Sequence, residues 1–317
     1  MGTGSSSKRP TRRVTNSITN YEFQITNFRA FFRLFVFICA FCIFAGDAFA
    51  QTLETLTEQI RSGNSEQKRS ALFEIRNRRS EEASRIAIPA LRDSEEIVRA
   101  TAAFSVIYLP KDEAFNALIP NLQDTAEIVR RETAYALGKT QNSSAIAPLI
   151  LAFQKDKSIE VKNACIVALG EIGDASAIDA LTQILEQKPK DDTEFLRRSA
   201  GRSIGQIAQI IQIKESYTVT PESFLPEKFK LLTVEKYQNL AAKFSQFRAA
   251  VPVLTQVLQN PKESGDAKRE AAFALGAIGD VTAVSILQAN LSSKDYYLAE
   301  ICKESLKKLS SVEKQSV

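Results

Sequence analysis

Histidine and tryptophan are absent from this chain of 317 residues, and the sequence contains a single methionine, Met1. Without histidine the chain has no side chain whose unperturbed pKa lies near neutrality. A serine or cysteine triad of the usual kind and a histidine-bearing metal site are excluded for the same reason. The sequence therefore predicts a protein without catalytic activity of its own, without a cofactor and without a bound metal.

A short phrase recurs along the chain. Ala-Leu-Gly occurs at 136–138, 168–170 and 274–276, and the second and third copies continue as Glu-Ile-Gly-Asp and Ala-Ile-Gly-Asp. Alignment of these phrases places six apolar residues at equivalent positions, separated by 31, 32, 35, 71 and 31 residues: Val98, Val129, Val161, Leu196, Ala267 and Leu298. A period of this size is typical of a stacked helical solenoid, in which each unit buries its apolar face against its neighbours.

Each unit has the pattern of two helices. Residues 112–123 carry apolar side chains at helical spacing, and a second apolar stripe follows Asp124. We expect Asp93, Asp124 and Asp156 to cap the second helices of their units at the N-terminus. We expect Gly138, Gly170 and Gly276 to end second helices in the left-handed conformation. Four first helices contain a proline, which predicts a first-turn position or a bend: Pro89, Pro120, Pro148 and Pro252.

These motifs make residues 53–310 resemble the HEAT-repeat superfamily, in particular the short bacterial HEAT-like repeats of the phycobilin-lyase type. The resemblance implies an all-α, right-handed solenoid of about seven helix pairs, and it is more specific for fold than for activity. Deoxyhypusine hydroxylases share this repeat type, but they bind iron through His-Glu pairs that this chain cannot supply. Phycobilin lyases need no such pair, so a cofactor- or pigment-handling protein related to them stays open as an alternative.

The first 50 residues are typical of a basic leader and signal peptide. Arg29 and Arg33 precede an apolar run at 34–45, and Ala48-Phe49-Ala50 precedes Gln51. We expect cleavage after Ala50 and export to the periplasm or cell envelope. The alternative is an inner-membrane anchor formed by residues 34–46, which would make the protein a membrane-tethered assembly factor. We expect the repeat array to occupy residues 51–310 and a flexible tail to occupy residues 311–317.

Charge balance depends on this leader. Six of the 41 Lys and Arg residues and two of the 37 Asp and Glu residues lie in positions 1–50, which leaves 35 of each sign. Nucleic-acid binding normally needs a basic surface that displaces counterions. A mature chain of zero net charge therefore argues against nucleic acid as a partner. The partners expected of the repeat surface are proteins, with membrane contact only if the leader is uncleaved.

Two cysteines remain after the leader. Cys165 and Cys302 each lie on an apolar helix stripe and are about three units apart. Because packed helices lie ~8–10 Å apart, this separation exceeds the ~7 Å limit between the Cα atoms of a disulfide. We expect two buried, free thiols.

Basic residues begin each second helix at the same position of the repeat. The row comprises Arg99, Arg130-Arg131, Lys162, Arg197-Arg198 and Lys268-Arg269. The favoured interpretation is that each base pairs with a loop aspartate such as Asp93, Asp124 or Asp156. The doubled bases are harder to neutralise, so Arg131, Arg198 and Arg269 are candidate contacts for an acidic partner.

An insertion of about residues 214–248 interrupts the repeat. Six of the sixteen aromatic residues outside the leader lie between Tyr217 and Phe247. We expect a helix that ends at Phe247 and buries Tyr237, Leu240, Phe244 and Phe247 on one face. Tyr217 and Phe224 do not share this spacing, which makes them candidate exposed anchors for a protein partner. The sequence thus predicts an exported scaffold that displays a rigid repeat surface to other proteins.

Overall fold

The computed structural model describes residues 52–190, 193–216 and 237–313. These residues contain helices and no strand. The helices and 3-10 helices are α2 (Ser65–Arg78), α3 (Glu81–Ala87), η1 (Ile88–Arg92), α4 (Glu96–Ser105), α5 (Lys111–Leu118), η2 (Ile119–Gln123), α6 (Glu127–Thr140), η3 (Ser143–Ala145), α7 (Ile146–Lys155), α8 (Ile159–Ile172), η4 (Ala175–Ala177), α9 (Ile178–Glu186), α10 (Glu194–Ser216), α11 (Leu240–Lys243), α12 (Ser245–Gln259), α13 (Gly265–Ile278), η6 (Val281–Ala283), α14 (Val284–Ala289) and α15 (Tyr296–Glu313). A further helix spans residues 52–62.

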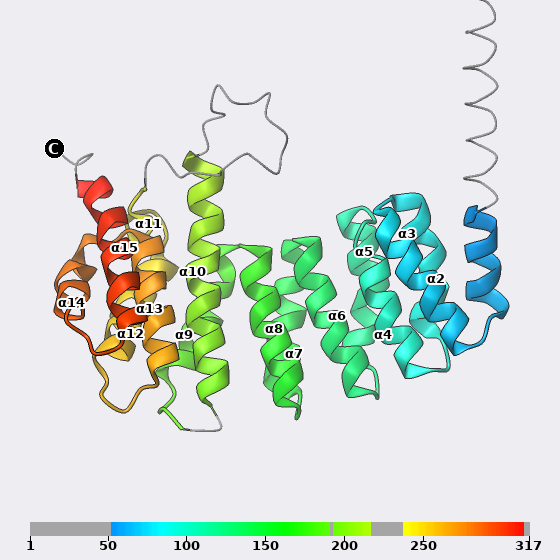
Figure 1. Ribbon diagram of the computed structural model, residues 1–317, viewed down its shortest axis with the longest axis horizontal. Coiled ribbons are helices and arrows are strands. Elements are labelled where there is room, and N and C mark those ends of the chain that lie inside the picture. Colours follow the sequence, from blue (N-terminus) through cyan, green and yellow to red (C-terminus); the bar gives the residue numbers. More distant parts are fainter. Residues whose placement is uncertain (1–51, 191–192, 217–236, 314–317) are drawn as a thin grey trace, which may run out of the picture. The chain divides into compact units, whose positions relative to one another are not determined.

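The described residues from Gln59 onward form one compact unit, an all-α solenoid. In chain order the described residues of this unit comprise α2 followed by six helix pairs, from the pair of α3 and α4 to the pair of α14 and α15. The second helices α2, α4, α6, α8, α10, α13 and α15 pack against one another in succession (Figure 1). The predicted solenoid of about seven units is confirmed.

The second helices pack closely because of the repeated glycine. Gly276 lies inside α13, and a Cβ atom there would be 2.3 Å from Ser305 Oγ on α15. Gly170 has the same relation to Ser203 on α10, at 2.7 Å. These serines in turn donate hydrogen bonds of 2.9 Å to a carbonyl of the preceding second helix. The Ala-Leu-Gly phrase is therefore the contact between successive second helices.

The predicted helix ends differ from the observed ones. The glycines of the Ala-Leu-Gly phrases lie inside α6, α8 and α13, and the left-handed C-caps of these three helices are Gln141 (φ 51°), Gly173 (φ 71°) and Gly279 (φ 78°). At the other end, Asp124 accepts the N–H of Ala126, which is itself the N-cap of α6. Asp93 and Asp156 accept the N–H of the N-cap residues Glu95 and Ser158 in the same way. The three aspartates therefore form Asx turns two residues before the caps and are not N-caps themselves.

The prolines do not occupy one common position. Pro89 and Pro120 open the 3-10 helices η1 and η2, which follow the first helices of two units. Pro148 lies in the first turn of α7, whereas Pro252 lies inside α12. First helices of neighbouring units therefore have different backbone courses.

Around the insertion, the single helix predicted to end at Phe247 is interrupted. Phe244 is extended (φ −120°, ψ 121°) between α11 and α12. Leu240 and Phe247 are fully buried, as expected, and Phe244 packs edge-on against Phe247 with ring centroids 6.0 Å apart. The chain returns beside α10, where the buried Gln212 side chain donates to the carbonyls of Gln238 (2.7 Å) and Ala277 (3.1 Å).

At the C-terminus α15 continues to Glu313 and buries Val312, so the array extends beyond the predicted boundary at residue 310. The leader, Tyr217 and Phe224 lie outside the described residues. Within the described ranges, no helix combines the length and apolar character needed to cross a membrane.

Candidate functional site

The basic row forms a ladder of contacts between neighbouring units. Arg99 binds Asp124 of the next unit through Nε (2.7 Å) and Nη2 (2.9 Å), and Arg130 binds Asp156 in the same way (2.6 and 3.1 Å). The remaining guanidinium nitrogen of Arg99 donates to two loop carbonyls of its own unit. Lys68 and Asp93 form the first contact of this kind, at 2.7 Å. The predicted pairing with loop aspartates is confirmed for Arg99 and Arg130.

The ladder makes the array sensitive to acid. The hydrogen bond from Arg99 lowers the pKa of Asp124 against a desolvation that raises it. An aspartate in the unfolded chain has a pKa of about 3.9, and the pKa of Asp124 in the folded chain is lower. The Arg99–Asp124 pair therefore stabilises the fold fully above about pH 3.9, and this contribution is lost as the pH falls through the folded-state pKa of Asp124. We expect Asp124→Asn to cost about 1–3 kcal/mol at pH 7 and to lose less stability than the unmodified chain at low pH. Thermal unfolding from about pH 7 to pH 2 measures both effects, and identical pH profiles would contradict the assignment.

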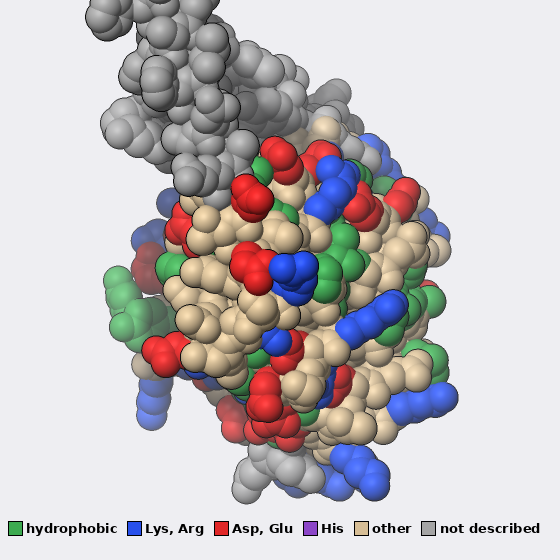
Figure 2. Space-filling model, turned by 90° about the vertical axis from the view of Figure 1, so that its right-hand side faces the viewer, with side chains coloured by type: hydrophobic (Ala, Val, Ile, Leu, Met, Phe, Trp, Pro, Cys, Tyr) green, Lys and Arg blue, Asp and Glu red, His purple; other side chains and the backbone are tan. Residues whose placement is uncertain are grey.

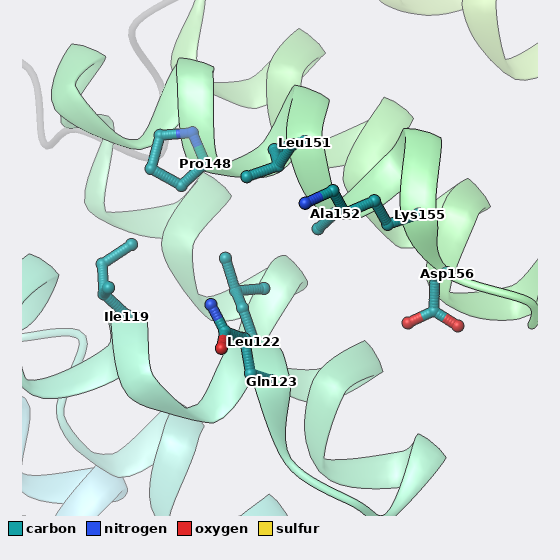
Figure 3. A pocket seen from close by; sticks show the side chains of 8 residues that line it. All are labelled: Ile119, Leu122, Gln123, Pro148, Leu151, Ala152, Lys155 and Asp156. Carbon is teal, nitrogen blue, oxygen red and sulfur yellow. The ribbon is translucent and has the colours of Figure 1, made fainter.

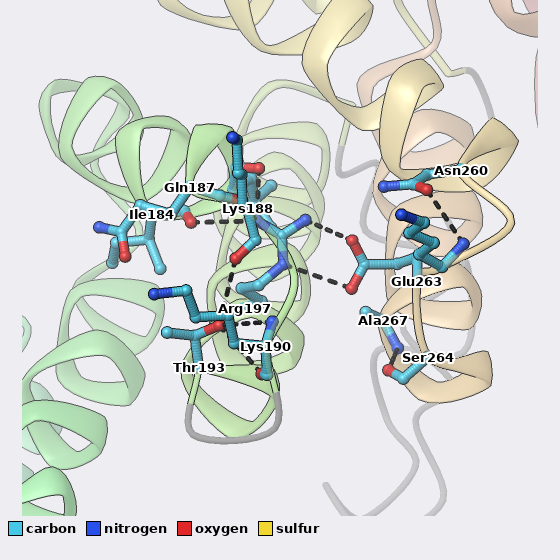
Figure 4. A network of polar contacts seen from close by, with 12 residues as sticks. Ile184, Gln187, Lys188, Lys190, Thr193, Arg197, Asn260, Glu263, Ser264 and Ala267 are labelled. Atoms are coloured by element: carbon cyan, nitrogen blue, oxygen red, sulfur yellow. Dashed lines mark hydrogen bonds and ion pairs between the residues drawn. The ribbon is translucent and has the colours of Figure 1, made fainter.

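A buried pair replaces the ladder where the insertion separates two units. Arg197 and Glu263 have side chains only 2% and 1% exposed. Both Nε and Nη2 of Arg197 donate to the Glu263 carboxylate, and Nη1 donates to main-chain carbonyls at the end of α9, including Leu185 at 2.6 Å (Figure 4). This arginine therefore joins α9, α10 and the loop before α13. Its role is structural, which removes it from the exposed basic row.

The three arginines predicted as partner contacts are all paired. Arg131 binds its neighbour Glu132 at 2.7 Å and lies two units away from Arg198 and three from Arg269. Arg198 and Arg269 are brought together by Asp266, which accepts Arg198 Nη1 at 3.0 Å and also binds Arg269. Each therefore has an acidic neighbour, in agreement with the favoured interpretation that the bases of the row are paired.

Arg198 and Arg269 nevertheless lie in an exposed cluster that sequence reasoning missed. The guanidinium of Arg198 stacks 5.2 Å from the centroid of Phe195, and that of Arg269 lies 5.8 Å from the centroid of Tyr297. Phe195 is 41% exposed, and Tyr296 and Tyr297, which meet edge-on, are 69% and 67% exposed. We call these five residues the Arg–aromatic surface. Aromatic and arginine side chains are the residue types enriched at energetic centres of protein interfaces.

The same face of the second helices carries a groove near the N-terminal end of the array. The groove has a volume of about 220 Å³ and crosses α2, α4 and α6. Phe73, which is 61% exposed, and Phe104, with Arg76 5.3 Å above its ring, are among its lining residues. Phe73, Phe104 and Tyr135 recur every 31 residues. Val98 and Val129 show the same 31-residue period, which is the sequence signal that could have located these three aromatic residues.

The visible end of the molecule in Figure 2 shows Lys, Arg, Asp and Glu side chains intermixed, with no region of one charge. This mixture agrees with the balanced charge of residues 51–317. The electrostatic field there does not favour one sign of partner.

Both thiols outside the leader are free and buried, as predicted. Burial raises the pKa of Cys165 to about 12 and that of Cys302 to about 11. Because the thiolate is the reactive form, we expect neither thiol to be alkylated in the folded protein at pH 8, and both to react once the protein is unfolded in urea. Peptide mapping of the labelled sites tests this. Rapid labelling of either cysteine in the folded protein would contradict the packing described here.

Two family profiles match the chain. HEAT repeats match residues 115–205, and the PBS lyase HEAT-like repeat matches residues 267–293. These two segments of the chain match HEAT-type repeats. This agrees with the resemblance inferred from the repeated phrase and with the helix pairs of the structure.

Among curated proteins, deoxyhypusine hydroxylase-B of Oryza sativa subsp. japonica is 26% identical over 291 residues, which covers 75% of this chain and 85% of that protein. Similar solved structures include human deoxyhypusine hydroxylase in complex with glycerol (17% identity, TM-score 0.34, covering 84% of this chain and 98% of that one). Another is the complex of CpcE and CpcF of phycocyanin lyase from Nostoc sp. PCC7120 (23% identity, TM-score 0.36, covering 70% and 86%).

The rice relative contradicts the prediction that this chain has no catalytic activity, because that relative is named as an enzyme. The iron site expected of such hydroxylases from the resemblance does not fit the residues present here. The sequence has no histidine, and the described ranges contain no group of three or more Cys, Asp and Glu that could hold a metal. A relation to an enzyme therefore does not carry an iron site with it.

Proposed function

We propose that this chain is an exported HEAT-repeat protein that binds another protein on the face formed by its second helices. The Arg–aromatic surface is the observation that supports the proposal. Phe195, Tyr296 and Tyr297 expose large apolar area. Arg198 lies over Phe195 and Arg269 over Tyr297, and Asp266 binds both arginines. Because ion pairs and ring contacts hold these side chains together before binding, a partner would meet a surface that needs little ordering.

Partner capture tests the binding surface. We expect Tyr296→Ser with Tyr297→Ser to weaken capture of the partner by ~2 kcal/mol or more, or roughly 30-fold in affinity. The control is Leu291→Ser, which removes another exposed apolar side chain outside the Arg–aromatic surface. Partners are first crosslinked in the cell envelope and identified by mass spectrometry. Equal capture by both variants and the unmodified chain would refute this surface as the interface.

Export is part of the proposal and has its own test. The apolar run and Ala48-Phe49-Ala50 support a mature N-terminus at Gln51 in a soluble envelope protein. N-terminal sequencing of the native protein measures this. Recovery of residues before Leu34 would instead support the membrane-tethered alternative.

The enzyme relative favours a second candidate, in which the bound partner or a bound cofactor or pigment is also acted upon. The match to the PBS lyase HEAT-like repeat supports the same alternative. Two measurements distinguish it from binding alone. One is an absorbance spectrum of the purified protein, which would reveal a copurified pigment. The other is the mass of the captured partner before and after incubation, which would reveal a covalent change.

A further inference from the structure

A second groove lies on the opposite layer of the array, between first helices. It has a volume of about 370 Å³ and is formed by η2 on one side and α7 on the other (Figure 3). Ile119 and Leu122 face Pro148 and Leu151 across it. Leu151 is 46% exposed, so the groove offers apolar area to a ligand without any rearrangement of the array.

The different backbone courses of the two elements explain why the groove is open. Pro120 is the second residue of the tightly wound η2 after α5, whereas Pro148 lies in the first turn of α7, which continues as an α-helix to Lys155. The second helices of the same units, α6 and α8, meet through Gly138, where a Cβ would be 2.7 Å from Ala168 Cα. Close contact on one layer and unlike helices on the other leave the apolar space between η2 and α7.

One end of the groove is basic. Lys155 lies one turn beyond Leu151, and Lys157 follows in the loop; both are exposed. In the part of the chain that the structure describes, neither ammonium group has an acidic partner. Asp156 lies between them, but Arg130 binds both of its oxygens (2.6 and 3.1 Å) and the Ser158 N–H donates to one (2.9 Å). The charge available to a ligand at this end is therefore positive.

We propose that this outer groove binds a short amphipathic helix of a partner protein, with acidic side chains in the last turn of that helix. Its apolar residues, spaced three and four apart, would lie between Ile119, Leu122 and Leu151, as in other complexes of a helix in an apolar groove. Its carboxylates would pair with Lys155 and Lys157. Charge complementarity at the groove end sets the direction of the bound helix. This interface is separate from the Arg–aromatic surface, and either can fail without the other.

The test uses two fluorescein-labelled amphipathic helical peptides. Both carry leucines along one face; one ends in a turn of glutamates, and in the other lysines replace those glutamates. Fluorescence anisotropy with the full chain should show binding of the glutamate peptide, and at least about tenfold weaker binding after Leu151→Asp, a change at the centre of the groove. Lys155→Glu with Lys157→Glu should reverse the preference between the two peptides.

The matched control is Lys188→Glu with Lys190→Glu, the same charge change in the exposed loop after α9. Circular dichroism should show unchanged helical content in every variant, because exposed substitutions rarely affect folding. Absence of binding by the glutamate peptide would overturn the proposal. So would a peptide preference that survives the change at Lys155 and Lys157, or one that reverses equally in the control. Self-association of the unmodified chain that Leu151→Asp abolishes would identify a second copy as the occupant, and would also overturn it.

Discussion

Replacement of Arg197 by methionine should lower the free energy of unfolding by about 3–5 kcal/mol, the range for breaking a buried ion pair by removal of one partner. The variant would leave the carboxylate of Glu263 buried without its counter-ion. It would also leave carbonyls at the end of α9, including that of Leu185, without their donor. Urea denaturation at pH 7 measures the effect.

The control for this prediction lies on the same helix. Arg202 pairs with Glu270 at 3.1 Å across the same two units, but its side chain is 69% exposed. We expect Arg202→Met to change stability by less than about 1 kcal/mol, because water screens an exposed pair. Equal effects of the two substitutions would mean that burial does not set the strength of the Arg197 contact. A double change of Arg197 and Glu263 to methionine should recover part of the loss, since it removes both charges but not the unpaired carbonyls.

Gly276→Ala should destabilise the array by about 1–3 kcal/mol, as overpacking of a close contact does. The added Cβ would lie 2.3 Å from Ser305 Oγ and 2.7 Å from Ser305 Cα, and a main-chain atom cannot move aside cheaply. Helix propensity alone predicts the opposite sign, because alanine is more favourable than glycine by about 0.8–1.0 kcal/mol in a helix interior.

Gly201→Ala is the matched control, because Gly201 is also inside a second helix, α10. Its nearest neighbour to a new Cβ would be Glu270 Cβ at 3.4 Å, an ordinary contact. We expect this variant to unfold at the same or a slightly higher temperature than the unmodified chain. If Gly276→Ala gained stability as Gly201→Ala does, the glycine would not be the contact between second helices.

Periodicity was sufficient to predict the array, because equivalent apolar residues must recur wherever identical contacts stack. It also located the arginines and aspartates that join neighbouring units. Periodicity did not reveal the role of the glycines. A glycine near the end of a helical pattern has the same sequence signature whether it caps the helix or allows a neighbouring helix to pack closely against it. Gly170 and Gly276 pack against serines from units that follow in the chain, and only the fold shows that contact.

The candidate site was predictable only in part. Arg198 and Arg269 were selected from their position in the repeat, but the ion pair that brings them together joins Arg198 to Asp266 across the insertion. Their stacking on Phe195 and Tyr297 was likewise not predicted. The outer groove had no sequence signal. It arises because Pro120 lies in a 3-10 helix whereas Pro148, in the next unit, lies in the first turn of an α-helix. The prediction of no catalysis rested on the absence of histidine, and this absence bears on particular mechanisms rather than on all enzyme chemistry.

Site-specific photo-crosslinking in the cell envelope tests the central claim, which is that the second-helix face binds a protein. A benzoylphenylalanine residue in place of Tyr297 should form a covalent adduct with one partner, and the same residue in place of Leu291 should not. The adduct should disappear when Phe195 and Arg198 are both changed to alanine in a protein that keeps its helical content. An adduct at both positions, or at Leu291 alone, would contradict the account.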